Sequence, residues 1–212
     1  MVTSYLQLLA KRYGGHLDEK ADTYIEFAVD GARRMQQLIC DLLSYSRVGR
    51  RGGAFGPVDF SQVADEAIEN LRATIEEHRG EVIHKGLPAV RGDHTQLVQL
   101  TQNLISNALK FHGEEPPRVC IAAEKSEGEW TFSVRDNGIG IDRKHQQRVF
   151  KIFQRLHTRD QYPGTGVGLA ICERIVDRHQ GRIWFDSEVG RGTTFYFTLP
   201  DATGPQEPAR RA

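Results

Sequence analysis

The chain has 212 residues, 39% of them apolar and 26% charged, a balance typical of a globular protein. It carries 28 basic and 28 acidic residues, so its net charge of zero gives no indication of nucleic-acid binding. No apolar run approaches the roughly 20 residues of a membrane-spanning helix, and no secretory leader is evident, so we expect a cytoplasmic protein without a membrane segment. The three cysteines form no CxxC pair, which argues against a disulfide framework or a zinc site.

Residues 1–48 are predicted to form a helical hairpin. The amphipathic segment MVTSYLQLLAKRY ends at a Gly-Gly pair, and a long helix follows over residues 23–48. Its small and apolar residues recur at spacings of three and four, as in a heptad seam: Ile25, Ala28, Ala32, Met35, Ile39, Leu42 and Ser46. The seam suits either a core within one domain or the pairing of two copies into a four-helix bundle. We favour the dimer, because the seam is long for one short partner helix.

A Gly- and Arg-rich segment, residues 49–58, is predicted to be a linker, and residues 59–200 a second domain. The polar tail, residues 201–212, is predicted to be disordered. In the second domain we expect helices near 61–78, 93–111, 142–153 and 167–179, and strands at EVIHKG, 117–125, 129–135, GRIWFDS and TTFYFTLP. Asp93 is a good N-cap for the helix over 93–111. Blocks of helices and largely antiparallel strands predict an α+β sandwich with the helices on one face of the sheet.

The stretch FSVRDNGIGI delivers an acid and two glycines at the end of a predicted strand. An ionised Asp136 accepts hydrogen bonds and cannot donate them, so its natural ligand is a donor such as an exocyclic amine. Gly138 and Gly140 permit a positive φ and let a flat ring approach the backbone. Taken alone, the stretch is more often an ordinary hairpin turn.

A second glycine cluster, PGTGVGLAICERIV, places Gly164, Gly166 and Gly168 directly before a predicted helix. The free N–H groups and the dipole of a helix N-terminus favour an anion there. The cluster lacks the GxxxxGK[ST] pattern and does not follow a strand, so it matches neither common phosphate-binding motif. We interpret it as a phosphate-binding lid of another type.

The third signal is QLTQNLISNALKF, in which Asn103, Asn107 and Lys110 share one helix face. An amide oxygen suits Mg²⁺, and a lysine can neutralise phosphate charge. A solvated polar face is the alternative explanation. Together, an acid for an amine, amides for a metal and glycines for phosphates predict a site for a Mg-nucleotide.

The order of NLISNALKF, DNGIGI, VFKIFQRLH, GTGVGLAIC and GRGTTF resembles the N, G1, F, G2 and G3 boxes of sensor histidine kinases. These belong to the GHKL superfamily, shared with gyrase, heat-shock chaperone and MutL ATPases. The resemblance covers about residues 59–200, and residues 1–47 more loosely resemble the dimerisation hairpin. IFQRLHTRDQYPGTGVGLAICERIVDRHQGRIW is especially similar to the kinase ends of bacterial phytochromes and related PAS- or GAF-linked sensors. The resemblance implies a Bergerat-type α/β sandwich that binds ATP and Mg²⁺.

The resemblance also implies roles for individual residues. Asn107 would bind Mg²⁺, with Asn103 beside it at the metal or the phosphates. Lys110 would face the phosphates, Phe111 would flank the nucleotide, and Asp136 would accept a hydrogen bond from the adenine amine.

Further roles fall in the glycine motifs and around them. Phe150 and Phe153 would anchor the lid, with core packing as an equal alternative, and Thr194 would reach the adenine edge through water. The glycine motifs complete the expected nucleotide site with Gly138, Gly140, Gly164, Thr165, Gly166, Val167, Gly168 and Leu169.

The family's phospho-accepting histidine lies in a box beginning SH, and none of the eight histidines here has that setting. We therefore expect an N-terminally truncated dimerisation helix and a chain that binds Mg-ATP without phosphorylating itself on the usual histidine. The expected partners are a second copy through the hairpin, a response-regulator receiver domain, and an upstream PAS, GAF or phytochrome-like sensor that is missing here.

Two other functions remain open. An anti-sigma type ATPase or Ser/Thr kinase of the same superfamily is disfavoured, because such kinases lack the helical hairpin. The other is a non-catalytic dimerisation and response-regulator docking module. The intact nucleotide boxes argue against a loss of ATP binding, but not against a loss of net activity.

Overall fold

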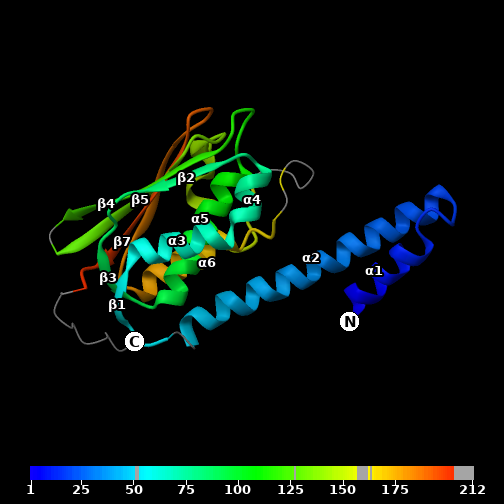
Figure 1. Cartoon of the computed structure of the whole chain (residues 1–212), viewed down its shortest axis with the longest axis horizontal. Coiled ribbons are helices and arrows are strands. Elements are labelled where there is room, and N and C mark those ends of the chain that lie inside the picture. The colour runs from blue at the N-terminus through cyan, green and yellow to red at the C-terminus, as the bar shows by residue number, and fades with distance from the viewer. Residues whose placement is uncertain (51–52, 127, 157–161, 163, 203–212) are drawn as a thin grey trace.

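The computed structural model describes residues 1–50, 53–126, 128–156, 162 and 164–202, so most of the predicted tail lies outside the described residues. A helical hairpin projects from an α/β domain (Figure 1). The hairpin consists of α1 (Val2–Tyr13) and α2 (Glu19–Arg50). Gly14 ends α1, and the Asp18 side chain accepts a 2.7 Å hydrogen bond from the Ala21 N–H in the first turn of α2. The predicted hairpin is confirmed.

The predicted seam of α2 is only partly covered within one chain. Of its residues, Ala32 is buried, whereas Ala28 is exposed and Met35, Ile39 and Leu42 are 58%, 58% and 49% exposed. Single exposed apolar side chains are common on monomers, whereas a contiguous exposed apolar stripe along one helix indicates an interaction surface. The dimer prediction stays a prediction, and these three residues are where it would be tested.

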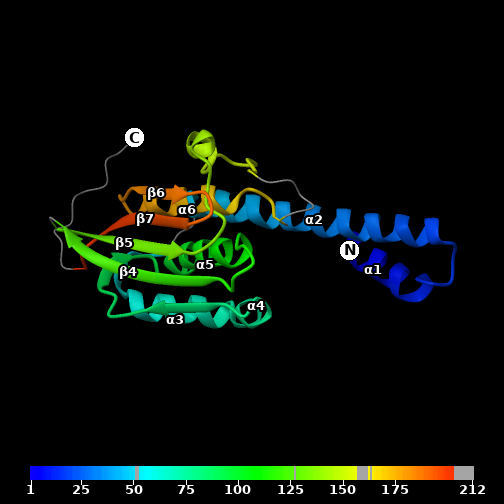
Figure 2. The ribbon, with the colours of Figure 1, turned by 90° about the horizontal axis from the view of Figure 1, so that it is seen from above.

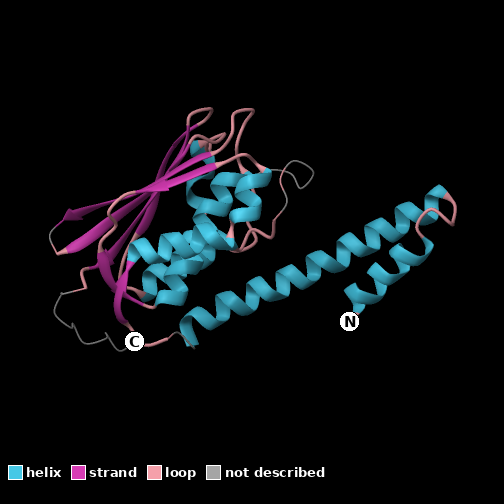
Figure 3. Cartoon of the chain, in the orientation of Figure 1, coloured by secondary structure: helices cyan, strands magenta, loops and turns pink. Residues whose placement is uncertain are grey.

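The second domain contains a five-stranded sheet in the order β2-β4-β5-β7-β6 and a two-stranded sheet of β1 and β3. β2 and β4 are parallel, and the other pairs are antiparallel. The elements are β1 (Gly56–Asp59), α3 (Phe60–Asn70), α4 (Arg72–Glu77), β2 (Glu81–His84), β3 (Ala89–Gly92), α5 (His94–Lys110), β4 (Arg118–Ser126), β5 (Glu129–Asp136), the 3₁₀ helix η1 (Arg143–Arg148), α6 (Gly168–Arg178), β6 (Ile183–Glu188) and β7 (Gly192–Pro200). The helices cover one face of the larger sheet, which confirms the α+β class (Figure 3).

Several details differ from the prediction. Strand β3 was not predicted, and the helical piece expected near 142–153 is the 3₁₀ helix Arg143–Arg148. The helix expected over 61–78 is two helices separated at Leu71. The predicted linker extended to residue 58, but Gly56–Asp59 is strand β1, paired with β3. A Gly-Pro start argues against a strand in sequence. The strand forms nevertheless, because the side chains of Val58 and Val90 are both buried in the core.

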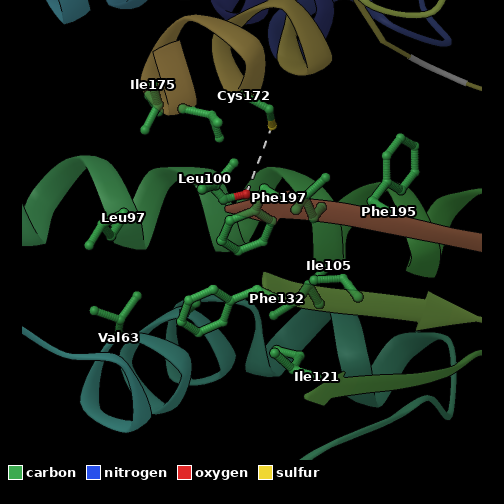
Figure 4. Packing of buried hydrophobic residues seen from close by; sticks show 14 of the residues in the cluster. Val63, Leu97, Leu100, Ile105, Ile121, Phe132, Cys172, Ile175, Phe195 and Phe197 are labelled. Atoms are coloured by element: carbon green, nitrogen blue, oxygen red, sulfur yellow. Dashed lines mark hydrogen bonds between the residues drawn. The ribbon is translucent and has the colours of Figure 1, made fainter. Parts of the chain in front are cut away.

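Alternation along the strands builds the core. Phe132 on β5 and Phe197 on β7 stack with centroids 5.1 Å apart, and Phe60 of α3 packs against Phe132 at 4.2 Å. Leu97 and Leu100 of α5 close the layer from the helical side (Figure 4). Full burial of one such side chain contributes about 1.5–3 kcal/mol. The consequence for function is that α5 is fixed against the end of β5.

The C-terminal half of α2 lies along the helical layer beside α6 (Figure 2). The Arg174 guanidinium stacks over the Tyr45 ring, with its central carbon 4.7 Å from the ring centroid. Val48, further along α2, is buried. The Gln96 side chain donates to the Val48 carbonyl at 3.3 Å. These contacts place one face of α2 at the edge of the α/β domain. No helix among the described residues is long and apolar enough to cross a membrane.

Candidate functional site

A cavity of about 400 Å³ lies between α5, the end of β5, β7 and the glycine-rich loop that precedes α6. Most of the predicted site residues line it: Asn103, Asn107, Lys110, Phe111, Asp136, Gly140, Gly164, Thr165, Gly166, Gly168 and Leu169. Predicted residues from three separate sequence motifs, between Asn103 and Leu169, therefore meet around one cavity. The predicted residues that do not line it are Gly138, Phe150, Phe153, Val167 and Thr194.

The helix α5 presents three polar side chains to the cavity. Asp93 begins this helix by accepting from the Gln96 N–H at 3.3 Å. Further along, the Asn103 amide donates to the Gly168 carbonyl at 3.3 Å and so ties α5 to the start of α6. Asn107 and Lys110 lie on the same face, one and two turns later. The spacing of four and three residues does bring these groups together.

Asp136 lies at the end of β5, the central strand of the sheet. Its Oδ1 accepts hydrogen bonds from the backbone N–H groups of Gly138 (2.8 Å) and Thr193 (3.0 Å). Burial raises the pKa of this carboxyl, although both hydrogen bonds oppose the shift. Within the described part of the chain, Oδ2 has no hydrogen-bond donor, so one acceptor oxygen remains for a ligand.

The turn after β5 needs its glycines for close packing. A Cβ at Gly138 would lie 2.4 Å from the Phe111 carbonyl oxygen, and one at Gly140 would lie 2.2 Å from the Glu188 carbonyl oxygen. Gly140 also has a φ of 72°. The Ile139 N–H donates to the Phe111 carbonyl at 2.9 Å. Gly138 thus shapes the cavity from behind rather than from its surface.

The glycine-rich loop reaches the other end of the cavity. Gly166 has a φ of 74°, and its carbonyl accepts from the Phe153 N–H at 3.0 Å. Val167 is fully buried, and it anchors the loop just before α6 begins at Gly168. Residues 157–161 and 163 lie outside the described residues, so the lid prediction is addressed only at its two ends.

The two phenylalanines of the lid differ from each other. Phe150 packs against the core, edge-on to Phe185 at 6.2 Å and to Phe195 at 6.4 Å. Phe153 has a φ of 62° and is 55% exposed. Core packing therefore describes Phe150 but not Phe153.

Thr194 lies one residue away from the position that lines the cavity. Its neighbour Thr193 is buried and lines the cavity, and successive residues of a strand face opposite sides of the sheet. Thr193 is thus the threonine that lines the cavity next to Asp136, and the role expected of Thr194 stays a prediction.

Two cavity residues from α2, Gln37 and Asp41, were not anticipated. The Thr165 hydroxyl donates to Asp41 Oδ2, which joins the glycine-rich loop to the hairpin. No local sequence pattern predicts this contact, because the pattern of α2 indicates only a dimerisation helix. Only the docking of α2 beside α6 brings Asp41 to the cavity.

Two basic side chains, Lys110 and Arg155, line the cavity near the glycine-rich loop, where the Asp41 carboxylate also lies. Burial, reinforced by the neighbouring Arg155, lowers the pKa of Lys110 to about 8. The Lys110 ammonium lies 4.4 Å from the centroid of the Phe111 ring, and that ring packs against Tyr162 at 5.0 Å. A half-buried cation beside a second basic side chain favours an anionic ligand.

The side-chain oxygens in the cavity suit a metal ion that is bound mainly through the phosphate oxygens of a ligand. No group of three or more His, Cys, Asp or Glu side chains that could hold a metal occurs among the described residues. Mg²⁺ is often bound through one or two protein oxygens, with phosphate oxygens and water in its other positions. The Asn107 amide oxygen in the cavity matches that pattern.

The sequence profile of the histidine kinase-, DNA gyrase B-, and HSP90-like ATPases matches residues 92–203. The chain belongs to this ATPase family. The match begins just before α5 and ends after β7, so it includes every element around the cavity except α2.

Two relatives are similar along almost the whole chain. Cyanobacterial phytochrome A of Nostoc sp. is 52% identical over 210 residues, which is 99% of this chain and 27% of that protein. The phytochrome-like protein Cph1 of Synechocystis sp. is 48% identical over 199 residues, which is 94% of this chain and 27% of that protein. The chain thus spans about a quarter of the length of these relatives.

Solved structures share the arrangement of hairpin and domain. Full-length ShkA in complex with AMPPNP matches with a TM-score of 0.71 and 26% identity, over 97% of this chain and 43% of that one. The histidine kinase ThkA in complex with the response regulator protein TrrA matches with a TM-score of 0.68 and 24% identity, over 93% of this chain and 57% of that one. The second likeness concerns the fold alone.

Proposed function

We propose that the chain binds Mg-ATP in this cavity and provides the catalytic core of a phytochrome-type histidine kinase. The observation that supports this most is the meeting of Asp136, Asn107, Lys110 and the glycine-rich loop around one cavity. An acceptor at one end and cations and N–H groups at the other match the two ends of a nucleotide. The AMPPNP bound to the similar ShkA supports the same ligand.

In this proposal each residue has a defined task. Asp136 Oδ2 accepts a hydrogen bond from the adenine amine, and Phe111 flanks the nucleotide. Lys110 neutralises phosphate charge, and the N–H groups near Gly166 and Gly168 contact the phosphates. Asn107, assisted by Asn103, holds the metal, which when bound shields the phosphate oxygens during transfer. Positioning and charge neutralisation are the main means by which phosphoryl transfer is accelerated.

The acceptor of the phosphoryl group is a histidine that we do not assign to this chain. The proposal therefore includes ATP binding without self-phosphorylation on the usual histidine. Two copies would associate through the exposed seam of α2, and the helical hairpin would receive a response-regulator receiver domain. An upstream sensor of the phytochrome, PAS or GAF kind would control the kinase, as the similarity to two phytochromes supports.

Calorimetric titration with a non-hydrolysable ATP analogue, with and without Mg²⁺, tests the proposal. We expect Mg-dependent binding that Asn107→Ala weakens. A matched control is Gln102→Ala on the same helix, since Gln102 does not line the cavity. Absence of binding to the wild-type chain would refute the nucleotide site and favour the docking-module function.

A further inference from the structure

Ser187 of β6 lies behind the predicted adenine end of the cavity and faces Thr193 across the β6–β7 pair. Three hydrogen-bonding groups converge on its hydroxyl. The Ile141 N–H donates to Ser187 Oγ at 2.7 Å, and Ser187 Oγ donates to the Gly192 carbonyl at 2.9 Å. The third contact joins Ser187 Oγ and Thr193 Oγ1, 2.9 Å apart, and either oxygen could be its donor.

Counting protons decides that third contact. A serine hydroxyl has one hydrogen and two lone pairs. The Gly192 carbonyl can only accept, so the Ser187 hydrogen must point to it for that bond to exist. Ile141 fills one lone pair of Ser187, and the other is left for Thr193. All three contacts are hydrogen bonds only if the Thr193 hydroxyl donates to Ser187.

The direction of that bond determines what Thr193 offers to a ligand. Its single hydroxyl hydrogen is committed to Ser187, so only its lone pairs face the cavity. Asp136 beside it also accepts in its carboxylate form, because its Oδ1 already receives the Gly138 and Thr193 N–H groups and a carboxylate carries no proton on Oδ2. The two polar side chains described at this end of the cavity, Asp136 and Thr193, therefore both present acceptors to a ligand.

We propose that Ser187 is a positioning residue for base selection: by holding Thr193 as an acceptor, it makes the cavity select a 6-amino purine over a 6-keto purine. This inference rests on the proposed function, since it requires a nucleotide base beside Asp136. The amine of adenine, or a water molecule that donates to the wall, meets these acceptors favourably. The keto oxygen of hypoxanthine or guanine would face these acceptors and, being an acceptor itself, could not form a hydrogen bond with them.

Ser187→Ala removes the hydroxyl that, among the described residues, accepts the Thr193 proton. The Thr193 hydroxyl then rotates and donates into the cavity, where it can reach a keto oxygen. The test compares ADP with inosine diphosphate, which has a keto oxygen in place of the amine, by calorimetry in Mg²⁺. We expect the wild type to prefer ADP by at least about 100-fold, and Ser187→Ala to reduce that preference about tenfold, the effect of one hydrogen bond.

Two variants provide controls. Ser187→Thr retains a hydroxyl and should preserve the preference. Asp186→Ala changes an exposed neighbour whose side chain faces the other side of β6, and it should leave both affinities unchanged.

The outcomes separate the two proposals. Failure of the wild type to bind ADP would refute the proposed function and this inference with it. If ADP binds but Ser187→Ala weakens both nucleotides equally, Ser187 is merely structural and the inference is wrong. Should Ser187→Ala fail to fold by circular dichroism, Thr193→Val removes the same acceptor, and an unchanged preference in that variant would also overturn the inference.

Discussion

Replacing Asp136 by Asn isolates its role in nucleotide binding. Asn keeps an Oδ1 that accepts from the Gly138 and Thr193 N–H groups, at 2.8 and 3.0 Å in the wild type. It replaces the free carboxylate oxygen with an NH₂ group, which donates toward a ligand that also donates. Asp136→Ala, in contrast, removes the acceptor of both N–H groups, so it perturbs the turn as well as the site.

The structure sets the magnitude of each change. A hydrogen bond to a charged group contributes about 1.5–3 kcal/mol, so losing it weakens ATP binding about 10- to 150-fold in Asp136→Asn. Alanine leaves two donors unpaired, at about 1–3 kcal/mol each when buried, and should lower the melting temperature as well. The asparagine variant should melt close to the wild type, because both backbone bonds remain.

Calorimetry and thermal unfolding, measured on both variants, distinguish these effects. The pH dependence adds a check. Burial raises the pKa of Asp136, so the folded protein takes up a proton there at a higher pH than an ordinary carboxyl does. ATP affinity should therefore fall on acidification through that raised pKa, and the fall should be missing in Asp136→Asn. Wild-type affinity in the asparagine variant would refute the assignment of Asp136 to the adenine amine.

Three further predictions concern the phosphate end and the hairpin. Because Lys110 loses its charge as the pH rises through about 8, ATP affinity should decline between pH 7 and 9 in the wild type but not in Lys110→Met; a flat wild-type profile would contradict a phosphate contact. Asp41→Asn keeps the acceptor for the Thr165 hydroxyl but removes a negative charge from the cavity, so AMPPNP should bind about fivefold more tightly by calorimetry, the effect of about 1 kcal/mol. Ile39→Glu places a charge in the exposed seam and should convert a micromolar dimer to a monomer by light scattering; a wild-type monomer would refute the dimer.

Local signals predicted the parts of the fold that local interactions determine. The start of α5 was predictable because Asp93 caps it through its own side chain, three residues from the N–H it accepts. The positions of Asn103, Asn107 and Lys110 followed from helical spacing alone. Gly140 was predictable as a close-approach residue, since few other residues adopt its φ of 72° without strain.

Features that depend on distant partners were not predictable. β1 forms because it pairs with β3, whereas its first residues, Gly56 and Pro57, are uncommon in strands and made a linker the expected structure. Whether Thr193 or Thr194 faces the cavity depends on the register of β7 against β5. The short alternation of apolar and polar residues in β7 does not determine which of the two threonines at its start faces inward. The contribution of Asp41 depends on how the hairpin docks, and no pattern in α2 encodes that.

The contact between the Thr165 hydroxyl and Asp41 joins the hairpin to the proposed nucleotide site, so a movement of α2 that breaks it would be thermodynamically linked to nucleotide binding. If a shift of α2 changes the affinity for nucleotide by some factor, nucleotide must change the equilibrium of α2 by the same factor. A displacement of α2 would then change the fraction of chains with bound nucleotide, and nucleotide binding would in turn shift the position of α2. α2 is 32 residues long, about 48 Å at the rise of an α-helix, so this reciprocity extends far beyond the cavity itself.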